Sequence, residues 1–130
     1  MIISWKYLAG FFEGDGSCGC YPIKFKKKTK TVRYKFRKSK NNYTYMRITF
    51  SLHNSDLSLL KRIRKFIGFG YVGKHNGLRL GKKQMYMYMT HCNQALKILT
   101  KIHPFVVGNY KLNQLERAIN KYETAKKGVV

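Results

Sequence analysis

Acidic residues are scarce in this sequence: only 5 Asp and Glu stand against 27 Lys and Arg, which gives a formal net charge of +22. Such an excess destabilises a compact protein through self-repulsion and favours a polyanion as its partner. Hydrophobic residues make up 44% of the 130 residues, which suffices for a packed core and excludes a wholly disordered chain. We therefore expect one compact domain, residues 1–130, that binds nucleic acid.

Cysteines and long apolar runs are also lacking. Cys18, Cys20 and Cys92 are too few, and odd in number, for a disulfide scaffold, so we expect an intracellular protein. The apolar run at residues 8–12 is too short for a signal peptide or a membrane span, and we expect no membrane partner. Abundant Lys, Asn, Tyr, Ile and Phe, which have A/T-rich codons, lead to the hypothesis of an organelle (mitochondrion or chloroplast) or a prokaryotic cytoplasm.

Hydrophobic periodicity predicts helices and strands in the order α-ββ-α-ββ-α-α. We expect helices at residues 4–14, 57–67, 93–103 and 109–127, and strands at residues 17–28, 43–52, 71–75 and 84–90. Every strand has one apolar face and one face of Tyr, Thr, Lys and Arg, which predicts an α+β fold with helices on one face of an antiparallel sheet. The other face could lie in a DNA groove or stack on bases; the alternative is an ordinary solvated face.

The placement of the few acidic residues singles out one segment. Glu13 and Asp15 lie two residues apart at the C-terminal end of the first expected helix, where the helix dipole disfavours negative charge. A sequence that breaks a local rule in this way often does so for function. Carboxylate and carbonyl oxygens at such a helix end suit a hard divalent cation. The alternative is that both acids pair with nearby lysines.

The same helix carries small residues on one side. Tyr7, Gly10 and Gly14 share a face, so a second helix could approach it closely. Because no other expected helix carries such glycines, we expect a sister helix from a second subunit, with packing inside the chain as the alternative. A two-fold axis through the paired helices would bring two copies of Asp15 together.

The segment Leu8 to Gly16, LAGFFEGDG, closely resembles the motif of the LAGLIDADG homing endonucleases. The chain length and element order are similar to those of the single-motif, homodimeric members. The resemblance implies an αββαββα fold, here with one further helix, whose saddle-shaped antiparallel sheet lies in the major groove of double-stranded DNA. It also implies an intron-encoded nuclease that hydrolyses phosphodiester bonds of both strands at a long pseudo-palindromic site. The rival functions are an intron maturase, which binds intron RNA, and another RNA-binding protein without cleavage activity.

The resemblance also assigns roles within the motif. It implies that Asp15 is the catalytic acid and that Asp15, with the carbonyl of Gly14, binds Mg²⁺ or Mn²⁺. Glu13 is interpreted as structural at the helix end. Tyr7, Gly10 and Gly14 are implied to form the dimer interface.

Two further catalytic positions follow from the resemblance. Asn54 corresponds by position to a polar residue at the end of the second strand, with His53 as the alternative. Lys111 corresponds to a basic residue before the last helix. The alignment around residues 107–110 is ambiguous by about two residues, so Asn109 is the alternative to Lys111.

The expected DNA-contacting residues come from strand alternation and from the basic hairpin tips. They are Lys24, Lys26, Lys28, Arg33, Lys35, Arg37, Tyr45, Arg47, Thr49, His75, Arg79, Lys82, Lys83, Tyr86 and Tyr88. Unbroken alternation in the first strand would bury its lysines, so we expect a β-bulge at Pro22 that turns Ile23 and Phe25 toward the core. In the fourth strand the methionines are expected on the face opposite the tyrosines.

Two other motifs have simpler explanations. Cys18, Cys20, His91 and Cys92 are spaced more tightly than the ligands of usual structural zinc sites, so we expect no zinc. Residues 68–72 match the middle of the RNP1 pattern of RNA-binding RRM domains, but they follow a helix directly. A glycine that ends this helix and leads into a strand explains them better.

Overall fold

The computed structural model describes residues 2–25, 43–75 and 84–128. Several of the expected DNA-contacting residues fall outside these ranges: Lys26, Lys28, Arg33, Lys35, Arg37, Arg79, Lys82 and Lys83. None of the helices within the three ranges is long and apolar enough to cross a membrane.

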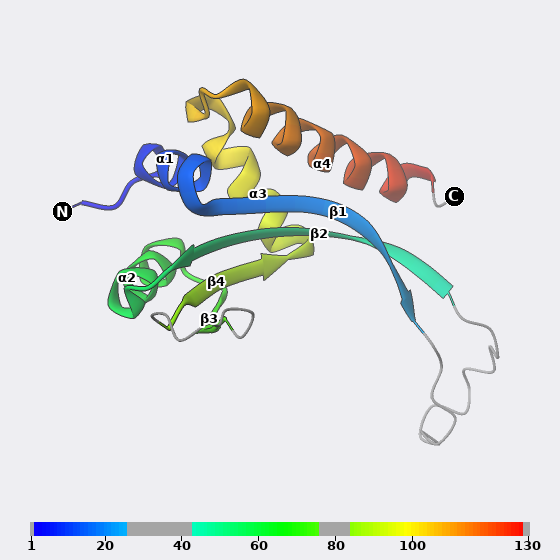
Figure 1. Cartoon of the computed structure of the whole chain (residues 1–130). Helices are drawn as coiled ribbons and strands as arrows, with labels where there is room; N and C mark the ends of the chain where they lie inside the picture. The colour runs from blue at the N-terminus through cyan, green and yellow to red at the C-terminus, as the bar shows by residue number, and fades with distance from the viewer. Residues whose placement is uncertain (1, 26–42, 76–83, 129–130) are drawn as a thin grey trace, which may run out of the picture.

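The fold is α+β, with helices packed on one face of a four-stranded antiparallel sheet (Figure 1). In chain order, the elements are α1 (Trp5–Asp15), β1 (Gly16–Phe25), β2 (Tyr43–Asn54), α2 (Leu57–Ile67), β3 (Tyr71–Lys74), β4 (Tyr86–His91), α3 (Cys92–Ile102), the short 3-10 helix η2 (His103–Phe105) and α4 (Asn109–Gly128). The strand order across the sheet is β1-β2-β4-β3. The predicted element order and fold class are confirmed.

Helix α1 begins and ends where local chemistry places it. The Ser4 hydroxyl accepts a hydrogen bond from the Tyr7 amide at 3.1 Å, which satisfies one of the free amides of the first turn. At the other end, the chain passes directly from α1 into β1 at Gly16. A Cβ at this position would lie only 2.8 Å from the Cα of Phe12, so the tight passage requires glycine.

Helix α2 has the boundaries that its end residues predict. The Asp56 carboxylate accepts a hydrogen bond from the Leu59 amide at 3.1 Å, and Gly68 ends the helix with a left-handed φ of 98°. Leu60 and Ile63 are fully buried and join the core between the helices and the sheet.

Strand β2 confirms the predicted alternation. Ile48, Phe50 and Leu52 are fully buried on the helix side, and the rings of Phe50 and Phe12 stack with centroids 5.7 Å apart. Because α1 rests on this strand through Phe12, the core sets the position of the end of α1.

The predicted bulge in β1 is wrong. The pairing with β2 continues without interruption, so Ile23 lies opposite Tyr45 on the open face and Lys24 lies on the helix side. No bulge is needed, because β1 curves away from α4 toward its end (Figure 1) and the Lys24 side chain is exposed there. Lys24 therefore does not share the face of Arg47, contrary to the expectation.

The predicted orientation of β4 is also wrong. Tyr88 is fully buried and Tyr86 packs against the core, so neither has the predicted DNA-facing position. The hydroxyl of Tyr88 donates to the Phe69 carbonyl at 2.7 Å, which satisfies its one polar atom inside the core. The neighbouring Gly70 has a φ of 113°, and a Cβ there would come within 2.4 Å of the Tyr88 ring. The absence of a side chain at this glycine makes room for the ring.

Candidate active site

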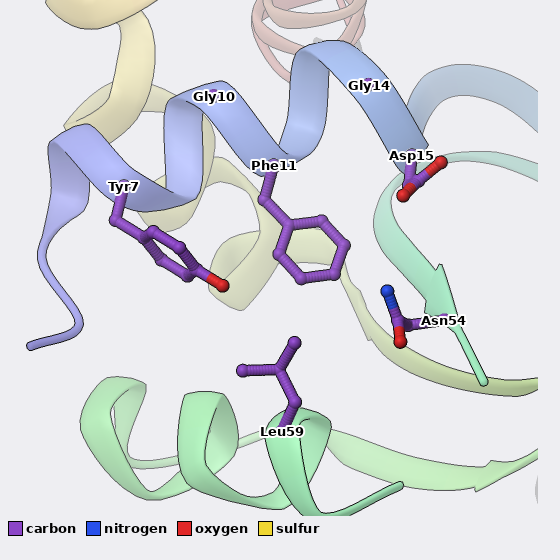
Figure 2. Close-up of a pocket in the computed structure, with 7 residues that line it drawn as sticks. All are labelled: Tyr7, Gly10, Phe11, Gly14, Asp15, Asn54 and Leu59. Atoms are coloured by element: carbon purple, nitrogen blue, oxygen red, sulfur yellow. The ribbon is translucent and has the colours of Figure 1, made fainter. Parts of the chain in front are cut away.

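Asp15 is the last residue of α1, and it is exposed beside a small open cleft. The cleft has a volume of about 270 Å³ and is lined by Tyr7, Gly10, Phe11, Gly14, Asp15, Asn54 and Leu59. Figure 2 shows that the lining comes from three places: α1 above, the end of β2 at one side, and α2 below. The sequence-predicted residues Asp15, Gly14 and Asn54 are thus brought together.

Asn54 lies at the end of β2 with a defined side-chain orientation. Its amide oxygen accepts a hydrogen bond from the Asp56 amide at 2.8 Å, so the oxygen is turned away from Asp15. The side-chain nitrogen is directed toward the side of the cleft where Asp15 lies (Figure 2). A hydrogen-bond donor therefore faces an exposed carboxylate.

Glu13, the other acid of the motif, is bound by the chain itself. Its carboxylate accepts hydrogen bonds from the backbone amides of Val107 and Gly108, the latter at 3.1 Å. These two donors compensate for the unfavourable helix end. The structural interpretation of Glu13 agrees with this geometry. The two amides could not be recognised from the sequence, because they lie 94 and 95 residues further along the chain.

Lys111 lies next to the turn that follows Asp15. Its ammonium group donates to the Gly16 carbonyl and sits 5.0 Å from the centroid of the Phe12 ring. Asn109, the alternative, is exposed at the start of α4. Of the two residues, it is Lys111 that contacts the residue after Asp15.

The thiol of Cys18, which experiences the charge of Lys111, is not a reactive group. Burial raises the pKa of Cys18 to about 11, with a smaller opposing effect from the charge of Lys111. Cys18 therefore stays protonated at neutral pH, and its side chain belongs to the core.

A pair of histidines borders the site on the open face. The His53 ring lies beside the backbone of Asp15, and its ring centroid lies 4.7 Å from that of His75. Burial, and then the proximity of His75, lower the pKa of His53, although Asp15 partly opposes this. His53, the residue before Asn54, is therefore neutral at pH 7 and lies beside Asp15.

The open face also carries the predicted polar residues of β2. Tyr45, Arg47 and Thr49 lie on the side opposite the core, as predicted. The guanidinium of Arg47 donates to the Tyr45 hydroxyl at 2.9 Å. Arg47 and Tyr45 lie near the end of the sheet farthest from Asp15, because β1 pairs Tyr21 with Arg47 and Gly16 with Leu52.

The glycines of α1 leave its surface bare. Gly10 and Gly14 are exposed, and a Cβ at either position would meet no atom within 4 Å. Tyr7 instead points into the cleft, where its ring contacts Phe11 edge-on with centroids 6.1 Å apart (Figure 2). Nothing within residues 2–25, 43–75 and 84–128 therefore requires glycine at these two positions.

The oxygen donors at the end of α1 fit a hard cation. They are the Asp15 carboxylate and backbone carbonyls, the donor type that Mg²⁺ and Mn²⁺ prefer. Across the described ranges, no group of three or more His, Cys, Asp or Glu side chains could hold a metal ion by itself. A cation at Asp15 would therefore need ligands from water, a phosphate or a second subunit.

The sequence profile of the LAGLIDADG endonucleases matches residues 8–127. The chain belongs to this family. The match covers the motif and every element from α1 to α4, so the cleft at Asp15 lies at the defining segment of the family. Curated protein sequences give no match to the chain.

Solved structures of homing endonucleases share the fold. The structure of I-CvuI with the I-CreI target is 18% identical, with a TM-score of 0.65, and the match covers 94% of this chain and 67% of that one. The archaeal intron-encoded I-Vdi141I with DNA gives 18% identity and a TM-score of 0.65, covering 95% and 69%. I-GzeII with its DNA target gives 20% identity and a TM-score of 0.63, but the match covers 98% of this chain and 38% of that one.

Proposed function

We propose that this chain is a homing endonuclease of one domain, residues 1–130, that cleaves both strands of a long pseudo-palindromic DNA site as a homodimer. Cleavage is phosphodiester hydrolysis that depends on Mg²⁺ or Mn²⁺. The observation that carries the proposal is the exposed Asp15 carboxylate beside Asn54, at the edge of an open sheet face in a protein of charge +22. Membership of the endonuclease family supports the reaction class.

In the proposed mechanism, Asp15 and the Gly14 carbonyl would hold the divalent cation, which would supply a water molecule of lowered pKa and positive charge for the leaving 3′-oxygen. The Asn54 amide nitrogen donates to a phosphate oxygen or to the attacking water. Lys111 holds the Gly16 carbonyl and adds positive potential beside the phosphate.

The open face of the sheet is the proposed DNA surface, with Tyr45, Arg47, Thr49 and His75 as contacts. The charge balance supports a nucleic-acid partner, because 27 basic residues against 5 acidic ones attract the phosphate backbone. The logarithm of the binding constant should fall with the logarithm of salt concentration by about 0.9 per phosphate neutralised. A flat salt dependence would contradict this part of the proposal.

The glycine surface of α1 is the proposed dimer interface, with Tyr7, Gly10 and Gly14 at or beside it. It is supported by the bare helix surface and by the match to less than half of I-GzeII, a chain long enough to hold two such units. Two strongly positive protomers repel one another, and α1 from Tyr7 to Gly14 carries no basic residue that would add to this repulsion. The partner copy would bring a second Asp15 to the second DNA strand.

The first test compares cleavage by the wild type and Asp15→Asn on a randomised duplex library, with Mg²⁺ or EDTA. We expect metal-dependent double-strand cuts at one long site and a rate loss of about 10³-fold or more in the variant, with DNA affinity nearly unchanged. Glu123→Gln is the matched control, because it removes the same charge from an exposed position of α4 and should cut normally. Normal cutting by Asp15→Asn would overturn the active-site assignment. Tight binding to intron RNA without DNA cleavage would favour a maturase instead.

The dimer has its own test in Gly10→Leu. A Cβ at this position meets no atom of the described residues within 4 Å and leucine improves helix propensity, so the protomer should fold at least as stably as the wild type. In a dimer, the same side chain would separate the two helices. We expect the dimer dissociation constant, measured by sedimentation, to rise by about tenfold or more, together with a loss of cleavage. An unchanged dissociation constant would place the interface elsewhere.

A further inference from the structure

Strand β4 presents methionine to the open face. Because Tyr88 is directed into the core, the alternate residues Met87 and Met89 lie on the opposite side of the strand. Both are half-buried between the neighbouring strands, with part of each side chain accessible. The two methionines are here called the β4 methionines.

The β4 methionines lie at the Asp15 end of the sheet. Across the strands, Met87 pairs with His53 and Gly73, and Leu52, the residue before His53, pairs with Gly16, the residue after Asp15. Met89 pairs with Ser51 in the adjacent row. DNA that places a phosphate at Asp15 therefore brings the base pairs nearest to the cut over these side chains.

The β4 methionines have little capacity for polar contacts with bases. A thioether offers no hydrogen-bond donor and only a weak acceptor. The two cross-strand rows, as far as the structure describes them, contain no Lys or Arg, since β3 contributes Gly73 and Tyr71 to them. Arg47, by contrast, lies toward the other end of the face with its donors beside Tyr45. The base pairs near the cut thus meet two apolar thioethers among His53, Ser51 and Tyr71, and the outer ones meet the charge of Arg47.

The major groove offers one apolar feature to such a surface, the C5-methyl group of thymine. We propose that Met87 and Met89 contact thymine methyl groups in the part of each half-site nearest to the cleaved bond, and so select T·A pairs there. The inference rests on the proposed function, because it takes double-stranded DNA over the open face as given. A flexible thioether adapts to the position of a methyl group, which allows contact without exact alignment.

The test uses binding in EDTA, so that it does not depend on cleavage. A preferred duplex is first selected from a randomised library with the wild-type protein, and each thymine is then replaced singly by uracil. Uracil keeps the hydrogen-bonding edge of thymine and lacks only the methyl group. We expect about a fourfold loss of affinity per contacted methyl, confined to the base pairs near the cut.

The variant Met87→Ala/Met89→Ala makes the assignment specific. It should bind the thymine duplex more weakly than the wild type and respond to uracil at those positions by less than about twofold. Arg47→Ala is the matched control: it should bind more weakly but keep the full response to uracil near the cut. A selected site without thymine near the cut, or an unchanged uracil response in the methionine variant, would overturn the inference. Failure of the wild type to select any duplex would instead overturn the proposed function.

Discussion

Strands β2 and β4 are neighbours in one sheet, and both alternate tyrosine or phenylalanine with other residues, yet they orient tyrosine in opposite ways. In β2, Tyr45 lies on the open face and its hydroxyl accepts from Arg47. In β4, Tyr88 lies in the core and its hydroxyl donates to the Phe69 carbonyl. A tyrosine ring suits both the core and the open face, so its orientation depends on where its hydroxyl finds a hydrogen-bond partner.

The largest effect that separates the two strands should be on stability. Tyr88→Ala leaves a cavity in the core and should lower the free energy of unfolding by about 3–5 kcal/mol. Tyr45→Ala removes a side chain that is 36% exposed on the open face and should cost about 1 kcal/mol or less. Urea denaturation of both variants measures the difference. Similar losses would mean that the two tyrosines are equally buried in solution.

The next effect should appear in DNA binding. Arg47→Ala removes a guanidinium from the open face and should weaken duplex binding by about tenfold, equivalent to ~1.4 kcal/mol. Its free energy of unfolding should change by less than about 0.5 kcal/mol, because the residue lies outside the core. Fluorescence anisotropy at fixed salt measures the affinity. An affinity within twofold of the wild type would show that the β2 side of the face lies off the DNA.

The smallest effect concerns the Tyr88 hydroxyl alone. Tyr88→Phe should lower stability by about 1 kcal/mol, because the buried Phe69 carbonyl loses its donor. Burial also raises the pKa of Tyr88 above its ordinary value of 10.0, so the folded protein retains a proton that the unfolded chain releases. This contribution to stability is complete below pH 10 and is lost as the pH rises toward the higher, folded-state pKa. The stability difference between the wild type and Tyr88→Phe should therefore shrink above pH 10 in denaturation measurements. A constant difference from pH 8 to 11 would contradict this origin of the shift.

Local features were predictable from the sequence. Ser4, Asp56 and Gly68 mark helix ends through interactions within a few residues, and the structure confirms each of them. The motif from Leu8 to Gly16 was equally clear, because it is continuous in the chain. The inward face of β2 followed from its own alternation.

The features that the sequence did not predict depend on distant partners. Tyr88 faces the core because Phe69, 19 residues away, supplies an acceptor and Gly70 supplies space. Lys24 needs no bulge because the curvature of β1 exposes the end of the strand, and a strand's curvature cannot be derived from its alternation (Figure 1). The partners of Glu13 are backbone amides, which have no residue type to recognise.

Those distant partners of the α1–β1 junction also determine when it can be completed during synthesis. Lys111 reaches Gly16 and Gln114 reaches Cys18, across 95 and 96 residues of chain. A ribosome adds about 5–20 residues per second, so the motif is synthesised seconds before Lys111 and Gln114. In a nascent chain, Asp15 therefore emerges before Lys111 and Gln114. The α1–β1 junction acquires their hydrogen bonds only when the start of α4 has emerged.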